Sequence, residues 1–165
     1  MTRATADLYD DFGEELTVLA PIFSDYGGQS AFEGKIATLK VFEDNTLVRA
    51  ELERSGEDRV LVIDGGGSLR CALVGDNLAV LARENGWSGI IVFGCIRDSA
   101  QISDIALGVK AIGVNPRKSV KRGEGQRDVA LSFAEATIEP GEYLYADRDG
   151  IVISKRVLPL SLIHI

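Results

Sequence analysis

The stretch from Val60 to Asp98 constrains the fold of this chain more than any other. It opens with a short apolar, β-branched run, Val60–Ile63, closed by Asp64-Gly65-Gly66-Gly67, the pattern of a buried strand and a tight turn. From Asp76 the apolar residues recur at helical spacing, and Gly89–Phe93 is a second apolar run. The order strand, helix, strand predicts an α/β unit in which the helix start lies near the end of the second strand.

Polar residues stand at both points that this unit brings together. Arg97 offers a bidentate fork for a carboxylate. Asp98 offers a hard oxygen ligand for a divalent cation, and Asp76 a second carboxylate that could hold metal-bound water. Free main-chain N–H groups at the helix start would face an anion; the residues there are Gly75, Asp76, Asn77 and Leu78. Spacing alone favours a plainer interpretation, a helix cap and a surface ion pair.

A resemblance to a known family changes that balance. Asp76, twenty intervening residues and then Arg97-Asp98 resemble the D-x20-R-D signature of the RraA-like family. That family includes the regulator of ribonuclease E activity A and the class II 4-hydroxy-4-methyl-2-oxoglutarate aldolases. Similar segments cover roughly residues 3–157: FSDYGG (Phe23–Gly28), FEDN (Phe42–Asn45), DGGGSLR (Asp64–Arg70), GDNL (Gly75–Leu78), GCIRD (Gly94–Asp98), KRGEG (Lys121–Gly125), PGEYLYAD (Pro140–Asp147) and GIVIS (Gly150–Ser154).

The resemblance implies a fold and an assembly. The fold class is α/β, a swivelling-type α/β/β/α sandwich with mixed sheets, formed by a single domain over residues 1–157. The assembly is a homotrimer with sites at the subunit interfaces. Residues 158–165 would form a tail that reads poorly as structure and has the look of a remnant of cloning or sequence assembly.

The resemblance also implies an activity and a role for each site residue. The activity is release of pyruvate from a small 2-oxo acid, by retro-aldol cleavage of 4-hydroxy-4-methyl-2-oxoglutarate or by decarboxylation of oxaloacetate, with Mg²⁺ or Mn²⁺ as cofactor. Asp98 would bind the metal, and Arg97 and Asp76 would be the catalytic residues. Arg97 would hold the substrate oxygens and Asp76 would orient water. The amides of Gly75, Asp76, Asn77 and Leu78 would bind the pyruvyl carboxylate.

Some residues depart from the aldolase pattern. Gln101 stands three places after Asp98, where the aldolases carry an acidic residue. The proton-transfer group is therefore open. Glu124 and Asp147 could reach across from a neighbouring subunit, or be solvated turn carboxylates. GGGSLR and FEDN also match the ribonuclease-regulator branch more closely, so the alternative is a non-catalytic protein that binds and inhibits ribonuclease E.

Composition excludes several other functions. A net charge of −7 argues against general nucleic-acid binding, although it could attract a basic partner or divalent cations. The single histidine, His164, excludes a histidine-based triad or multi-histidine metal site. Cys71 and Cys95 lie in apolar surroundings and are expected to be buried free thiols. No secretory signal is visible in Met1–Ala20 and no run is apolar enough to span a membrane, so we expect a cytoplasmic protein.

The rest of the chain predicts a helix near the N-terminus and several short strands. A helix from Thr5 with an apolar face through Leu19, a helix over Thr46–Ser55 and one over Ile102–Ala106 are expected. Cys71–Val74 could be a strand or a connector, and the basic cluster from Arg117 to Arg122 a solvated loop, an intersubunit patch or a nucleic-acid contact. Strands are expected at Lys35–Phe42, Val109–Val114, Val129–Phe133, Ala136–Ile138, Tyr143–Tyr145 and Ile151–Ser154.

Overall fold

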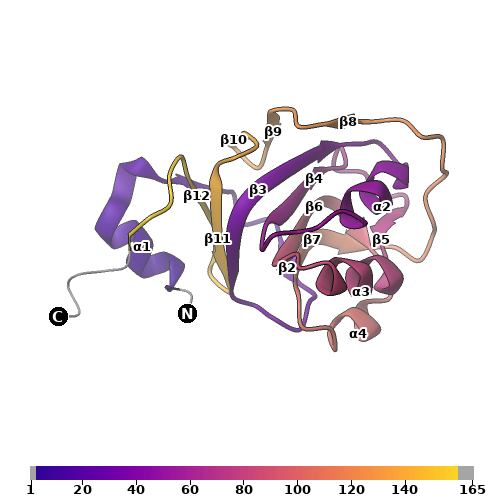
Figure 1. The fold of residues 1–165 in the computed structure, drawn as a ribbon, viewed down its shortest axis with the longest axis horizontal. Helices are drawn as coiled ribbons and strands as arrows, with labels where there is room; N and C mark the ends of the chain where they lie inside the picture. The colour runs from indigo at the N-terminus through magenta and orange to yellow at the C-terminus, as the bar shows by residue number, and fades with distance from the viewer. Residues whose placement is uncertain (1–2, 160–165) are drawn as a thin grey trace.

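A curled sheet of mixed direction organises the structure (Figure 1). The computed structural model describes residues 3–159. Its main path runs β1-β12-β11-β3-β4-β6-β7-β2, with β5 paired to β6, β8 paired to β3, and β9–β10 as a separate hairpin. The strands are β1 (Thr17–Val18), β2 (Ser24–Asp25), β3 (Phe32–Lys40), β4 (Val60–Asp64), β5 (Ala72–Val74), β6 (Gly89–Ile96), β7 (Gly108–Val114), β8 (Gln126–Arg127), β9 (Leu131–Phe133), β10 (Ala136–Ile138), β11 (Tyr143–Asp147) and β12 (Gly150–Ser154).

Strand β3 belongs to both halves of this sheet. Its first residues pair antiparallel with β11, Phe32 opposite Ala146, and its later residues pair parallel with β4, Ile36 opposite Val60. Strands β4, β6 and β7 continue in the same direction. The carboxyl ends of β3, β4, β6 and β7 therefore lie along one edge, where parallel α/β sheets commonly bind ligands.

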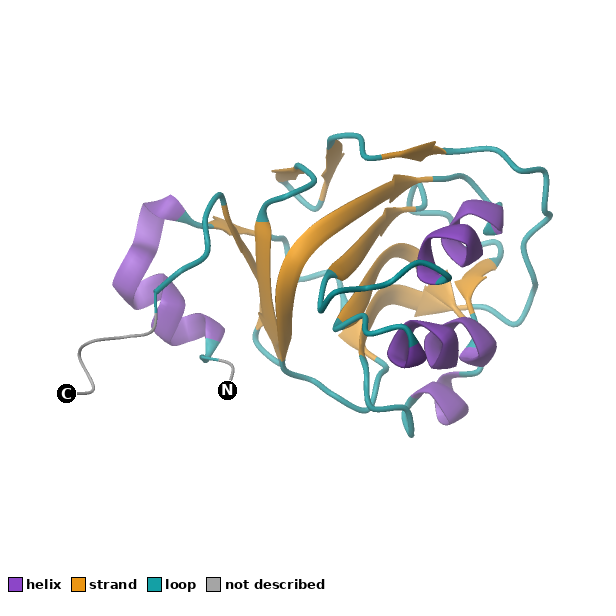
Figure 2. Ribbon diagram, in the orientation of Figure 1, coloured by secondary structure: helices purple, strands orange, loops and turns teal. Residues whose placement is uncertain are grey.

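Helices cover both outer surfaces (Figure 2). They are α1 (Thr5–Phe12), a 3₁₀ turn (Gly13–Glu15), α2 (Thr46–Leu52), α3 (Asp76–Glu84) and α4 (Ser99–Ile102). Along β4 the apolar side chains alternate: Leu61 and Ile63 pack in the cluster with α2 and α3, whereas Val60 and Val62 pack with β11 and β12. On the far side α1 packs through Leu8 against β11 and β12. The order helix, sheet, sheet, helix confirms the predicted α/β/β/α fold class.

Several predicted boundaries are wrong, for local reasons. The first helix ends at Phe12 because Gly13, at a φ of 48°, turns the chain away, and Leu19 packs in a different cluster from Leu8. The helix expected over Ile102–Ala106 is instead α4, which starts at Ser99, since the Asp98 carbonyl accepts a hydrogen bond from the Ile102 N–H. The ambiguous Cys71–Val74 run contains the short strand β5.

The remaining strand and helix boundaries shift by a few residues. β3 begins at Phe32 and ends at Lys40, α2 ends at Leu52, and β6 extends to Ile96 because β5 and β7 pair with its last residues. β9 begins only at Leu131, and β11 runs on to Asp147. Only β10 lies where the sequence predicts it, residue for residue.

The C-terminal end of the described chain packs against the fold. Leu158 is buried beside Tyr145, whose hydroxyl accepts a hydrogen bond from the Leu158 N–H at 2.9 Å. The rest of the predicted tail, including His164, lies outside the described residues apart from Pro159.

Cys71 and Cys95 are buried free thiols, as predicted. Within residues 3–159, no helix has the length and apolar character needed to cross a membrane.

Asp147 has a structural role within its own chain. Its carboxylate accepts hydrogen bonds from the Thr5 N–H at 2.8 Å and the Thr5 hydroxyl at 2.7 Å, so it ties the start of α1 to β11. Burial raises the pKa of this carboxyl, but these hydrogen bonds outweigh burial and hold it below its usual range. The prediction that Asp147 serves a neighbouring site loses its basis, because both carboxylate oxygens already have partners.

Candidate active site

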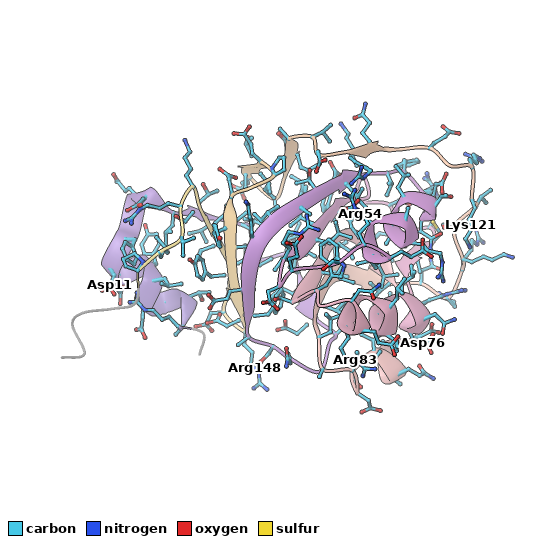
Figure 3. All side chains as sticks on the ribbon, viewed as in Figure 1. Asp11, Arg54, Asp76, Arg83, Lys121 and Arg148 are labelled. Carbon is cyan, nitrogen blue, oxygen red and sulfur yellow. The ribbon has the colours of Figure 1, made fainter. Side chains whose placement is uncertain are left out.

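A polar pocket of about 190 Å³ lies where α3 begins and β6 ends. The six residues predicted as a site all line it: Gly75, Asp76, Asn77, Leu78, Arg97 and Asp98. Six further residues complete the lining: Asn45, Arg49, Ala72, Lys118, Ser119 and Lys121. Figure 3 shows Asp76 and Lys121 on the end of the molecule opposite α1. The structure therefore brings the predicted residues together and adds a second wall to them.

Asp98 joins the end of β6 to the start of α3. Its backbone adopts the left-handed conformation, φ 59° and ψ 41°, which aspartate tolerates better than most residues. This turn directs the carboxylate back to α3, where Oδ2 accepts a hydrogen bond from the Asp76 N–H at 3.0 Å. The prediction that the Asp76 amide binds the pyruvyl carboxylate is thereby corrected, because this N–H already donates to Asp98. In the first turn of α3, the N–H groups of Asn77 and Leu78 are left for a ligand.

Gly75 keeps the space between the two segments open. A Cβ atom at this position would lie 2.8 Å from Asp98 Oδ2 and 3.5 Å from Arg97 Nε. Gly75 itself provides no side-chain cap for α3, and Asp98 engages only the Asp76 N–H, so the N–H groups of Asn77 and Leu78 stay available to an anion. Arg97 is anchored by a hydrogen bond from Nη1 to the Pro116 carbonyl at 3.3 Å. Two free N–H groups at a helix start beside a guanidinium form a receptor for a carboxylate.

Basic residues from two other segments also line the pocket and form what is called here its basic wall. Arg49 comes from α2, and Lys118 and Lys121 come from the segment after β7. The sequence does not predict these three residues as part of the site; it predicts Lys118 and Lys121 only as members of the basic cluster from Arg117 to Arg122, a solvated loop, an intersubunit patch or a nucleic-acid contact. With Arg97, the lining carries four cationic side chains against the two carboxylates of Asp76 and Asp98. Such a balance favours a ligand with more than one negative charge.

Asn45 presents an unsatisfied acceptor at this pocket. Its Nδ2 donates to the Leu73 carbonyl at 3.1 Å, which fixes the orientation of the amide. Within the described residues, Oδ1 is buried and accepts no hydrogen bond. A buried acceptor left unpaired costs about 1–3 kcal/mol, so water or a ligand is expected to satisfy it.

The donor set fits a hard divalent cation that retains most of its water. Asp98, Asp76 and Asn45 offer oxygen atoms, the ligands that Mg²⁺ and Mn²⁺ prefer. The described residues contain no group of three or more histidine, cysteine or acidic side chains placed to hold a metal ion, so few protein ligands would contact the ion directly. Mg²⁺ commonly binds through one or two carboxylates together with water and substrate oxygens.

Glu124 lies outside this pocket. It lines a separate hollow with Lys40 and Asp64, beyond the carboxyl ends of β3 and β4. Its main-chain N–H donates to Asp44 at 3.1 Å, which fixes its backbone. Glu124 therefore cannot serve the pocket of its own chain from this position.

The comparisons with known proteins agree on one family, but the similar proteins carry different functional names. The family model for RraA-like proteins, Aldolase/RraA, matches residues 5–153. A protein of Alkalilimnicola ehrlichii, provisionally named as a 4-hydroxy-4-methyl-2-oxoglutarate aldolase, is 56% identical over 158 residues, covering 96% of this chain and 98% of that protein.

Two solved structures share the fold over nearly the full chain. An S-adenosylmethionine:2-dimethylmenaquinone methyltransferase from Geobacillus kaustophilus has a TM-score of 0.93 at 52% identity, covering 94% of this chain and 97% of that one. The RNA-processing inhibitor RraA from Thermus thermophilis has a TM-score of 0.92 at 42% identity, covering 99% and 98%. Because these names differ, the chemistry of the pocket has to decide among them.

We predict that Gly75→Ala disables the pocket without unfolding the chain. The backbone at Gly75, φ −116° and ψ −172°, suits any residue, so the fold should tolerate the change. The new methyl group would push Asp98 Oδ2 away and narrow the anion site. Calorimetric titration with oxalate and Mg²⁺ should show at least tenfold weaker binding, at about 1.4 kcal/mol per tenfold, while thermal unfolding stays near the parent value. Unchanged oxalate affinity would contradict this geometry.

Proposed function

The chain belongs to the RraA-like family, and from its pocket we propose that it is a divalent-metal-dependent carbon–carbon lyase that releases pyruvate from small 2-oxo dicarboxylic acids. The observation that carries the proposal is the pairing, in one pocket, of a carboxylate receptor with oxygen ligands for a hard cation. Retro-aldol cleavage of 4-hydroxy-4-methyl-2-oxoglutarate and decarboxylation of oxaloacetate are its two proposed reactions, which share the pyruvate enolate.

The substrate is proposed to bind by its two carboxylates. The carboxylate next to the ketone lies at the start of α3, against the amides of Asn77 and Leu78 and the guanidinium of Arg97. The distal carboxylate faces the basic wall of Arg49, Lys118 and Lys121. This arrangement holds the reacting bond between two fixed anchors, and such positioning supplies much of the rate in enzymes.

The proposed reactions move one electron pair onto the ketone oxygen. In the retro-aldol reaction the 4-hydroxyl proton leaves, the C3–C4 bond breaks, and its electrons form the enolate of pyruvate with negative charge on the C2 oxygen. C4 becomes the ketone of a second pyruvate, and a proton returned to C3 completes the first. In oxaloacetate the same electron pair comes from the bond to the departing CO₂.

The residues of this chain are assigned to the charge and the protons of those steps. Arg97 donates hydrogen bonds to the oxygen on which charge develops. Asp98, held in place by the Asp76 N–H, would bind the metal, and Asp76 would orient the water that exchanges protons with the substrate. A bound Mg²⁺ or Mn²⁺ supplies Lewis-acid stabilisation of the same negative charge.

The pocket is less suited to a methyltransferase. Drug- and cofactor-sized ligands occupy pockets of about 300–1,000 Å³ that are mostly apolar. This pocket is smaller, at about 190 Å³, and charged residues form half of its lining. The sequence also lacks the glycine-rich GxGxxG pattern of a Rossmann nucleotide site.

The central prediction concerns pyruvate release. Purified protein should form pyruvate from both substrates with Mg²⁺ or Mn²⁺ and lose that activity in EDTA. Asp98→Ala and Arg97→Ala should each lower the rate by about 10²–10³, the typical cost of removing one group that stabilises transition-state charge. The exposed residues Asp104 and Arg83 offer matched controls, and Asp104→Ala and Arg83→Ala should keep parent rates. Equal background rates with metal and with EDTA would refute the proposal.

A second candidate function is binding and inhibition of ribonuclease E. Its support is the similarity to the Thermus RNA-processing inhibitor and the net charge of −7, which suits a basic partner segment. We predict that such a complex is retained at low salt and lost as ionic strength rises, because salt screens charge attraction between exposed groups. A pull-down with the host ribonuclease at low salt tests it, and failure to retain the enzyme would count against it. Asp98→Ala should not affect retention, which separates this role from catalysis.

The chain is also proposed to assemble as a homotrimer. Four large apolar side chains are more than half exposed near the pocket end of the sheet: Phe42, Leu69, Val114 and Val120. A closed ring would cover such a surface on every subunit. Light scattering during gel filtration should give three times the 17.8 kDa chain mass, and a monomer at micromolar concentration would contradict the trimer. In the ring, Glu124 remains a candidate to face a neighbouring pocket.

A further inference from the structure

The Asp44 carboxylate, only 2% exposed, is the centre of a hydrogen-bond network beside the pocket. Its Oδ1 accepts hydrogen bonds from the Thr46 N–H at 2.9 Å and the Thr46 hydroxyl at 2.7 Å, at the start of α2. Its Oδ2 accepts from the N–H groups of Arg122 at 2.8 Å and Glu124 at 3.1 Å. One carboxylate therefore joins two segments nearly eighty residues apart in the sequence.

The segment that Asp44 holds is the strap, defined here as residues 115–125 between β7 and β8. Figure 1 shows it running in a wide arc past α2. It has almost no regular structure, and Ser119 is its one buried residue, 4% exposed. Its other hydrogen bonds to the start of α2 are few: Val120 N–H to the Glu43 carbonyl, Asn45 N–H to Ser119 Oγ, and Gly123 N–H to Thr46 Oγ1.

The strap carries part of the pocket wall. Lys118, Ser119 and Lys121 line the pocket, and all three lie within a few residues of the N–H groups that Asp44 holds. Both lysines are exposed, so the path of the strap determines where their ammonium groups can reach. Near Lys118 this path is also set by pairing with Ala72, and near Lys121 it is set by the bonds to Asp44. Holding the strap therefore sets the geometry of the basic wall.

We propose that Asp44 is a positioning residue that builds the distal-carboxylate side of the pocket by fixing the strap, without contacting the substrate itself. The kinetic part of this proposal rests on the lyase function proposed above. The structural part does not, because it concerns only the attachment to α2 of the strap around Lys121.

The chemistry requires a carboxylate at this position. Four donors converge on its two oxygens, and a carboxylate offers about four acceptor sites whereas an amide offers two. An amide NH₂ in place of Oδ2 would face the N–H groups of Arg122 and Glu124, donor against donor. Asp44→Asn therefore breaks the link to the strap and leaves the Thr46 contacts possible, with almost no change of volume.

The same network determines the charge state of Asp44. Burial alone raises its pKa, but the hydrogen bonds from Thr46, Glu124 and Arg122 outweigh burial and hold the pKa well below its usual range. A pKa lowered by folding contributes stability above the ordinary aspartate pKa and loses it as pH falls through the folded value. The strap is consequently fixed throughout the neutral range, and Asp44 is not a switch near pH 7.

The proposal is tested on the full chain in two ways. Enzyme kinetics report on substrate binding at the basic wall, and proteolysis reports on how firmly the strap is held. In Asp44→Asn the displaced strap should cost the substrate one hydrogen bond between a strap lysine and its distal carboxylate. KM for oxaloacetate should therefore rise about tenfold, while kcat changes less than about threefold. Trypsin should cleave after Lys118, Lys121 or Arg122 at least tenfold faster than in the parent chain. Asp104→Asn, an exposed aspartate away from the strap, should change neither value.

A double-mutant cycle separates positioning from general stability. If Asp44 acts through Lys121, the Asp44→Asn and Lys121→Ala effects on KM should be far from additive. Additive effects, or a parent KM together with parent trypsin resistance, would overturn the proposal. A fall in kcat with no change in KM or in strap cleavage would identify a merely structural role and would also overturn it.

Two further arms keep the proposal testable if the simplest experiment fails. Should Asp44→Asn not fold, Thr46→Val removes one donor to Asp44 and the acceptor for the Gly123 N–H, and should raise KM and strap cleavage about threefold. Should the parent protein not cleave oxaloacetate, the lyase function fails, but strap proteolysis still tests the attachment of the strap by Asp44. Parent-like cleavage of the strap in both variants would then refute the proposal.

Discussion

Strand β3 is the constraint on which the rest of the structure depends, because both halves of the sheet pair with it. Phe32, at its first position, explains how the sheet can curl there. The ring lies where a side chain at Gly89 or Gly108 would otherwise stand: a Cβ at these positions would come within 2.4 Å and 2.1 Å of it. The two glycines open β6 and β7, so a large ring packs at the amino ends of the parallel strands and directs β3 toward β11. Apolar packing fills the amino ends of the parallel strands, and the polar residues of the pocket lie at the carboxyl ends.

The pocket at that carboxyl edge combines two kinds of support. Asp98 and Arg97 leave a strand that is buried along almost its whole length, and the Asp76 N–H holds the Asp98 carboxylate, so this side is set by the fold itself. The basic wall is different, since Lys118 and Lys121 belong to an exposed segment. Its Lys118 end pairs with Ala72, and its Lys121 end is held at α2 through Asp44 and Ser119. A rigid side for the reacting end of the substrate and an attached strap for its far end fit a lyase that must hold two fragments and release both.

The sequence predicts the pocket residues that lie within one strand–helix–strand unit, and it does not predict those that come from segments distant in the sequence. The strand–helix–strand unit placed Gly75–Leu78 beside Arg97 and Asp98 because both ends of that unit are fixed by short turns. Arg49, Lys118 and Lys121 could not be found in this way, since the strap returns to α2 through hydrogen bonds from Asp44 that no periodicity reveals. The helix predicted from Thr5 with an apolar face through Leu19 is too long for a related reason. Leu16 and Leu19 keep a helical spacing, but Gly13 ends the helix and the two leucines pack in separate clusters. The fold class itself came from the family resemblance, which the structure confirms.

The central claim is that Asp98 holds a divalent metal between the start of α3 and the end of β6, with the substrate carboxylate beside Arg97. Relatives with this fold carry names as different as aldolase, methyltransferase and RNA-processing inhibitor, so only the occupancy of the pocket can decide. The most direct measurement is anomalous X-ray diffraction from crystals grown with Mn²⁺ and oxalate, a stable mimic of the pyruvate enolate. The account predicts one strong manganese peak within coordination distance, about 2.0–2.3 Å, of an Asp98 oxygen, and oxalate against the amides of Asn77 and Leu78. Manganese bound elsewhere, or oxalate in the pocket with no metal at Asp98, would contradict it.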